Sequence, residues 1–169
     1  MRNGLCGSVA TLVLLLTAHI ADAQPKLDPQ IFPGDVRQAL ESAERFELIS
    51  LYPSDKLGGE QFHGYSVLGR TIIADAGTRA RLITALKEGV EDNKYGIAAA
   101  CFNPRHGIRA THGSTSVDLV ICFQCYQALV YYGDGRRGEF LPTSKPEPAF
   151  NEVLRAAKLP LSRDLERRN

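Results

Sequence analysis

The segment 117–132 constrains the fold more than any other, because both of its faces are largely apolar. Up to Phe123 the apolar side chains stand at odd positions, and from Tyr126 they stand at even positions. A strand with two apolar faces belongs inside a sheet, so we predict a central strand here. One extra residue in a strand produces such a change of parity, which predicts a β-bulge near Gln124. The bulge would place Cys122 and Cys125 on the same face of the sheet.

Short strands and amphipathic helices alternate through the rest of the chain. Asp75 is a suitable N-cap for a helix in which Leu82, Ile83, Leu86 and Val90 recur at helical spacing. The pattern predicts an α+β fold, in which an antiparallel sheet with a central hairpin or meander packs about three short helices mainly on one face. The expected helices are 35–43, 75–93 and 148–159, and the expected strands are 46–52, 62–74, 97–111, 117–132 and 139–142.

The N-terminus has the pattern of a signal peptide. Arg2 precedes an apolar run at 10–18, and the small residues of Ala21-Asp22-Ala23 form a cleavage site. We therefore expect an exported protein, periplasmic or extracellular, whose mature chain begins at Gln24. The apolar run is shorter than the roughly 20 residues of a membrane-spanning helix, so no membrane span is expected. The expected organisation is a signal peptide (1–23), a flexible arm (24–34), a single α+β domain (35–160) and a charged tail (161–169).

Charge gives no indication of a nucleic-acid partner. The formal net charge is +1, and the basic clusters of the chain carry no interleaved aromatic residues. Sequence motifs for phosphate loops, dinucleotide binding, nucleophile elbows and zinc proteases are absent. We read His63 as a strand histidine with its hydrogen bonds satisfied, and His112 as a solvated turn residue. Whether the protein is an enzyme stays open, and the partner, if any, is unknown.

Three cysteines are predicted to meet in one hairpin. A turn at 112–114 pairs Cys101 with Cys125, and the bulge adds Cys122 to the same face. If Pro104 kinks its strand, His106 turns inward, and Cys101, His106, Cys122 and Cys125 form a four-ligand metal site suited to zinc or to a softer ion such as copper(I).

The same cysteines allow two other interpretations. Without the kink, Arg105 shares the face of Cys101, and its charge would favour a thiolate for redox chemistry. In an oxidising compartment two of the three cysteines commonly pair. On the chain-entropy model a Cys122–Cys125 bridge contributes about 2 kcal/mol and a Cys101–Cys125 bridge about 3.5 kcal/mol, so a structural disulfide is expected to use Cys101.

Three segments resemble a family of exported bacterial proteins of unassigned function. They are FHGYSVLGRT (62–71), CFNPRHGIR (101–109) and VDLVICFQCYQ (117–127), and the likeness rests chiefly on a Cys-x3-Arg-His element followed by Ile-Cys-Phe-x-Cys. The resemblance implies an envelope or secreted location and groups Arg105 and His106 with the three cysteines. It implies no activity.

The first hypothesis is therefore an exported domain that binds a thiophilic metal, as a structural zinc site or for metal handling. The alternative is a disulfide-stabilised interaction module of the cell envelope without catalytic activity. A thiol redox protein is the third.

Overall fold

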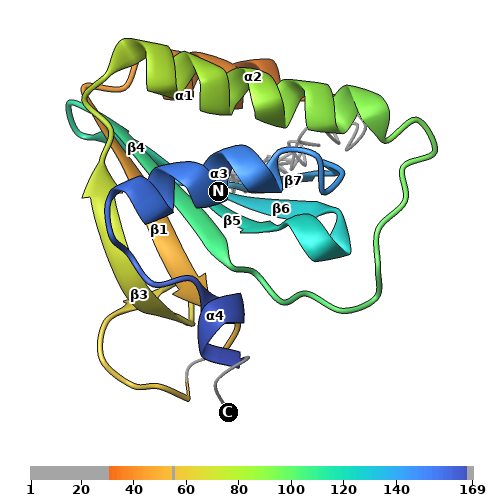
Figure 1. The fold of residues 1–169 in the computed structure, drawn as a ribbon. Helices are drawn as coiled ribbons and strands as arrows, with labels where there is room; N and C mark the ends of the chain where they lie inside the picture. The colour runs from red at the N-terminus through yellow and green to blue at the C-terminus, as the bar shows by residue number, and fades with distance from the viewer. Residues whose placement is uncertain (1–30, 55, 167–169) are drawn as a thin grey trace, which may run out of the picture.

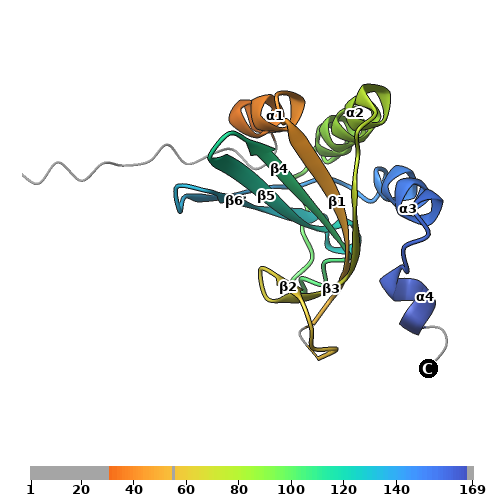
Figure 2. The same ribbon diagram turned by 90° about the vertical axis from the view of Figure 1, so that its left-hand side faces the viewer.

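The computed structural model of the protein describes residues 31–54 and 56–166. Seven antiparallel strands form one curled sheet, and the helices lie on one side of it (Figures 1 and 2). The strands are β1 (Arg45–Tyr52), β2 (Gln61–Phe62), β3 (Tyr65–Ile72), β4 (His106–His112), β5 (Thr115–Cys122), β6 (Gln127–Tyr132) and β7 (Arg137–Phe140). Their order in the sheet is β2-β3-β1-β4-β5-β6-β7. The predicted α+β class is confirmed.

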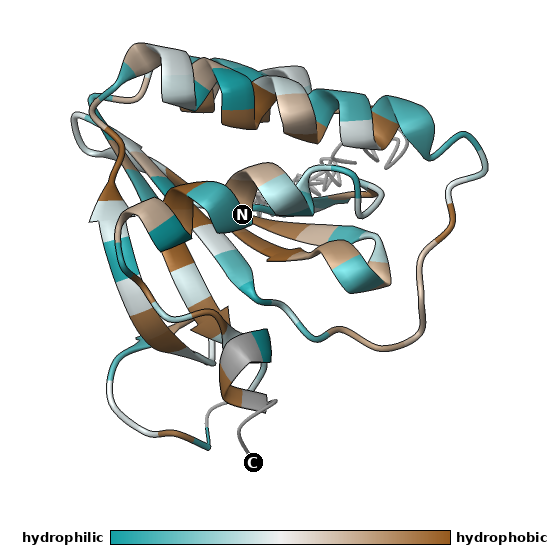
Figure 3. Ribbon diagram, in the orientation of Figure 1, coloured by the Kyte–Doolittle hydropathy of each residue, from teal (hydrophilic) through white to brown (hydrophobic). Residues whose placement is uncertain are grey.

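The helices lie close to their predicted positions. They are α1 (Gly34–Glu41), α2 (Ala76–Asp92), α3 (Glu147–Ala156) and the short α4 (Ser162–Glu166), and Phe123–Cys125 forms one 3-10 turn, η1. Asp75 caps α2 by accepting a hydrogen bond from the backbone N–H of Thr78 at 2.6 Å. The predicted stripe of α2 is buried, and Figure 3 shows the apolar side of α2 turned toward the sheet.

Two apolar clusters cover the two faces of the sheet. The larger one joins α1, α2 and α3 to one face, with Phe46, Leu119 and Phe150 fully buried at its centre. The smaller one, on the other face, consists of Ile49, Leu51, Phe62 and Val120, with Tyr65, Val67, Phe102 and Tyr131 at its margin. Since β5 contributes to both clusters and lies between β4 and β6, its predicted interior position is confirmed.

The segment 117–132 is not one bulged strand, and that prediction is wrong. The chain reverses at η1, so β5 and β6 form a hairpin in which Val117 pairs with Tyr132 and Cys122 with Gln127. Each odd-numbered residue of β5 therefore faces an even-numbered residue of β6, and paired residues share a face. A hairpin of this register produces the same parity change as a bulge.

Two other strand predictions need correction. The expected strand 97–111 begins only at His106, and the residues between α2 and β4 form the long loop at the right of Figure 1. The expected strand 62–74 is interrupted near its start. The chain turns at His63 and Gly64, both with positive φ, and this turn joins β2 to β3 in a hairpin. Local apolar content alone did not separate these loops and turns from strands.

Only parts of the two ends of the chain are described. The expected signal peptide and most of the arm lie outside the described residues. Part of the expected charged tail is folded: Leu161 and Ser162 are buried, and α4 packs beside β1. Within residues 31–54 and 56–166, none of the helices has the length and the apolar character that crossing a membrane requires.

Candidate functional site at the cysteine turn

A disulfide closes the turn between β5 and β6. Cys122 ends β5, Cys125 ends η1, and their sulfurs are bonded to each other. Both residues are buried, at 1% and 0% exposure. The backbone N–H of Cys125 also donates to Sγ of Cys122 at 3.1 Å. The expectation that a structural disulfide would use Cys101 is wrong, because the tight turn brings its own two cysteines into bonding distance.

Cys101 lies beside this disulfide with an exposed side chain. Its Sγ is 3.9 Å from Sγ of Cys125. Two hydrogen bonds hold the loop there: the N–H of Ala99 donates to the carbonyl of Cys125 at 2.9 Å, and the N–H of Asn103 donates to Sγ of Cys125 at 3.3 Å. Two of the expected approaches between sulfurs are present, Cys101 to Cys125 and Cys122 to Cys125, although Cys101 reaches Cys125 from a loop rather than from a paired strand.

His106 faces away from the cysteines. It pairs with Ile121, whose side chain belongs to the helix-side core, whereas the next residue, Cys122, points to the other face. Its ring lies 5.1 Å from the ring of Phe123, and its Nε2 is 2.9 Å from Oδ1 of Asn151. Burial lowers the pKa of His106 to about 4, so the ring is neutral at pH 7.

The four predicted metal ligands are therefore not gathered into one set. Among residues 31–54 and 56–166, no three His, Cys, Asp or Glu side chains form a group that could hold a metal ion. In addition, Cys122 and Cys125 share a disulfide, whereas metal ligation requires thiolates. The expected kink at Pro104 does not turn His106 inward, because β4 begins at His106 itself in regular register.

Arg105 links the cysteine turn to the C-terminal part of the fold. Its guanidinium donates to the side-chain oxygen of Gln124 at 3.0 Å and to Oγ of Ser162 at 3.1 Å. Its backbone N–H donates to the carbonyl of Ile121 at 3.2 Å. Arg105 thus contacts Gln124, one of the two residues between the bonded cysteines, as well as α4.

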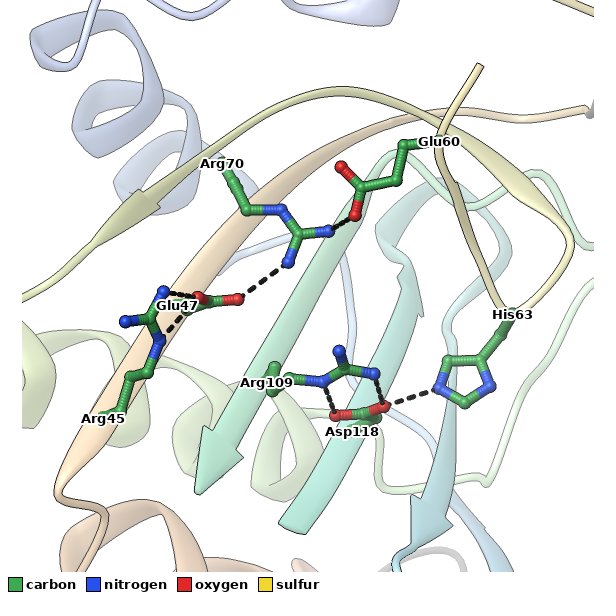
Figure 4. A network of polar contacts seen from close by, with 7 residues as sticks. All are labelled: Arg45, Glu47, Glu60, His63, Arg70, Arg109 and Asp118. Carbon is green, nitrogen blue, oxygen red and sulfur yellow. Dashed lines mark hydrogen bonds and ion pairs between the residues drawn. The ribbon is translucent and has the colours of Figure 1, made fainter. Parts of the chain in front are cut away.

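A charged network on the face opposite the helices was not predicted (Figure 4). Asp118, 5% exposed, accepts two hydrogen bonds from Arg109, at 2.9 and 2.6 Å, and one from His63 at 2.8 Å. Burial raises the pKa of Asp118, but these hydrogen bonds outweigh it and the net pKa is lowered. His63 is a turn residue, and its ring stacks on Tyr131 with centroids 3.8 Å apart.

A second part of the network surrounds Glu47, which is also buried. Glu47 accepts hydrogen bonds from Arg45 and from Arg70, and Arg70 also pairs with Glu60. These contacts fasten β3 and the segment before β2 to β1. The sequence did contain a signal for this network, since Glu47 and Asp118 each stand within an apolar strand. A carboxylate that is buried in such a strand requires a charged or hydrogen-bonding partner.

No protein-family model, curated protein or solved structure that was compared with the chain matches it significantly. Function is therefore inferred from the geometry of the site.

Proposed function

We propose that the protein is an exported thiol–disulfide exchange protein in which Cys101 reacts with the Cys122–Cys125 disulfide. The observation that supports this proposal is the 3.9 Å separation between the exposed Cys101 sulfur and Sγ of Cys125. Thiol–disulfide exchange needs a thiolate that can reach one sulfur of a disulfide. The signal-peptide pattern agrees with a compartment in which disulfides persist.

The first step is an exchange within the chain. The Cys101 thiolate attacks Sγ of Cys125, a Cys101–Cys125 bond forms, and the Cys122–Cys125 bond breaks. Cys122 takes the electron pair and leaves as a thiolate. The N–H of Cys125, 3.1 Å from Sγ of Cys122, stabilises the charge on that leaving sulfur.

The second step passes the disulfide to an outside dithiol. A substrate thiolate attacks the sulfur of Cys101, and Cys125 leaves as a thiolate that accepts the N–H of Asn103. The second substrate thiolate then attacks the substrate sulfur of this mixed disulfide and releases Cys101. The substrate is oxidised to a disulfide, the pair Cys122 and Cys125 is reduced to two thiols, and the protons come from the substrate.

Burial separates the roles of the three cysteines. Cys122 and Cys125 are at most 1% exposed, so a large substrate cannot approach them directly. Cys101 is exposed and touches both the solvent and the disulfide. It therefore acts as the relay between the buried pair and the substrate.

The test is the rate at which dithiothreitol reduces the disulfide in protein purified without reductant. Cys101→Ser should slow the reduction by at least about tenfold, because the direct route to the buried sulfurs is blocked. It should leave the melting temperature unchanged, since the side chain is exposed. Cys122→Ser should accumulate the Cys101–Cys125 bond, which peptide mapping by mass spectrometry detects.

Equal reduction rates in Cys101→Ser and the wild-type protein would reject the relay. The Cys122–Cys125 bond would then be structural only, as in the interaction module.

Zinc binding by the reduced chain is a second candidate, and the position of the Cys101 sulfur beside the Cys122–Cys125 disulfide favours it. Reduction would provide up to three thiolates, from Cys101, Cys122 and Cys125, and a water molecule could occupy the fourth position. Equilibrium dialysis of the reduced protein should then find one zinc ion per chain, lost in Cys122→Ser and retained in His106→Ala. Reduced wild-type protein that retains no zinc at neutral pH would reject this candidate.

A further inference from the structure

A cavity of about 380 Å³ opens between α3, α4 and the first residues of β4. It lies on the helix side of the sheet, where Figures 1 and 2 show α4 below α3. Polar and charged side chains line most of it, including Arg105, His106, Asn151, Arg155, Ser162 and Arg163. Because His106 faces this side of the sheet, the cavity is separate from the three sulfurs.

The charge lining the cavity is positive. Three guanidinium groups face one carboxylate, that of Glu147. Arg163 is paired with Glu147 at 3.4 Å, and Arg105 is held by the hydrogen bonds described above. In the part of the chain that the structure describes, Arg155 makes no side-chain hydrogen bond or ion pair. Arg155 therefore brings an uncompensated positive charge to the rim of the cavity.

Two uncharged side chains that are hydrogen-bonded to each other, His106 and Asn151, line the cavity. His106 is 2% exposed, and its Nε2–H donates to Oδ1 of Asn151 at 2.9 Å. This bond fixes the amide of Asn151 with its oxygen toward the histidine, so that its NH₂ group is left as a donor. Within residues 31–54 and 56–166 that NH₂ group has no acceptor. One turn of α3 separates Asn151 from Arg155, so both side chains project from the same side of the helix.

We infer that this cavity binds the carboxylate or phosphate group of a small molecule. A guanidinium and an amide NH₂ on one helix face can both donate to a single oxyanion, and charge-assisted hydrogen bonds of this kind are the strong ones. Pro148 and Leu161 supply apolar wall for the carbon atoms of the ligand.

Titrations followed by ¹H–¹⁵N NMR at constant ionic strength test the site, with inorganic phosphate and succinate as separate probes. At least one probe should produce saturable shifts in Asn151 and Arg155. Arg155→Gln should weaken its binding by about tenfold or more, the loss expected for one charge-assisted contact. Arg37→Gln is the matched control, because Arg37 is an exposed arginine on α1, away from the cavity, and it should leave binding unchanged.

The two probes distinguish the oxyanions. Saturable binding of phosphate alone assigns a phosphate ligand, and binding of succinate alone assigns a carboxylate. Asn151→Asp, which replaces the donor by a charge that repels anions, should abolish binding of either. Two outcomes would overturn the site: no saturable shift with either probe, or a response of the same size in Arg155→Gln as in the wild-type protein.

Discussion

At the scale of single residues, two buried carboxylates, Asp118 and Glu47, are the polar side chains that most need their partners. On the face away from the helices, Asp118 is paired with Arg109, and Glu47 is paired with Arg45 and Arg70. Their partners lie in different strands, and His63 comes from the β2–β3 turn. Removing one charge from such a set leaves its partners poorly compensated.

We therefore predict that Asp118→Asn destabilises the protein strongly. Arg109 loses a bidentate acceptor, and the loss of free energy of unfolding should be about 2–4 kcal/mol. The control is Glu152→Gln, which breaks the exposed pair with Arg81 and should cost less than about 1 kcal/mol. Urea denaturation at pH 7 measures both values, and similar costs for the two variants would contradict a stabilising role for Asp118.

His106 should make stability depend on pH. Its pKa is about 4 in the folded protein, against 6.5 as the ordinary value. The unfolded chain therefore binds a proton more readily, and stability is lost as the pH falls from about 6.5 toward 4, by about 3 kcal/mol at most. In His106→Gln the loss between pH 7 and 4.5 should be smaller than in the wild-type protein.

His112→Gln is the control for this experiment, because His112 is exposed near the β4–β5 turn. The variant should keep the loss of stability at low pH, because His106 is intact in it. If His106→Gln shows the wild-type profile as well, the buried histidine is not the group that titrates.

Residues of the site were only partly predictable. The three cysteines were expected to meet through hairpin pairing, but Cys101 reaches Cys125 from a loop, and the β5–β6 turn joins Cys122 to Cys125. The side to which His106 points depended on whether Pro104 distorts the strand, and the sequence does not determine that. The partnership of His63 with Asp118 joins residues far apart in the chain, so no local pattern revealed it.

At the scale of elements, the helices and β1 were predicted well, whereas the bounds of the strands between 97 and 132 were not. A helix cap and an apolar stripe can both be recognised within a short stretch of sequence, so they predict a helix without knowledge of the rest of the fold. Asp75 and the apolar stripe of α2 are an example. The segment 117–132 shows the opposite case, because a bulge and a hairpin change the parity of the apolar residues in the same way. Only the pairing of β5 with β6 distinguishes the two.

Gly89 allows α2 to pack closely against Pro146, in the segment before α3. A Cβ atom at this position would lie 2.6 Å from Cγ and 3.0 Å from Cδ of Pro146, whose ring is rigid. Although alanine is the better helix former by about 1 kcal/mol, overpacking should dominate, and Gly89→Ala should lower the free energy of unfolding by about 1–3 kcal/mol.

Gly34→Ala is the matched control in α1, since a Cβ atom added there would have no other atom within 4 Å and the backbone φ is not positive. It should leave stability unchanged or raise it slightly. Thermal unfolding of both variants is the measurement. A stable Gly89→Ala protein would show that α2 can move away from Pro146 at little cost.

At the scale of the whole molecule, the redox state of the cysteines at the β5–β6 turn depends on the cellular compartment of the protein. The cysteine chemistry proposed above requires an oxidising environment, and the signal-peptide pattern predicts one. N-terminal sequencing of the protein from a periplasmic or secreted fraction should find Gln24 as the first residue. Intact Met1 in a cytoplasmic fraction would contradict export and would favour reduced cysteines.

The position of β1 sets the order in which the sheet can assemble. β4 to β7 are consecutive hairpins, so their contacts are local and carry little loop-closure entropy. β1 lies between β3 and β4, and its pairing with β4 must close a loop that contains β2, β3 and all of α2. Topology of this kind slows folding. Pulse-labelled hydrogen exchange during refolding should therefore find the amides of the β4–β7 hairpins protected before those that join β1 to β4.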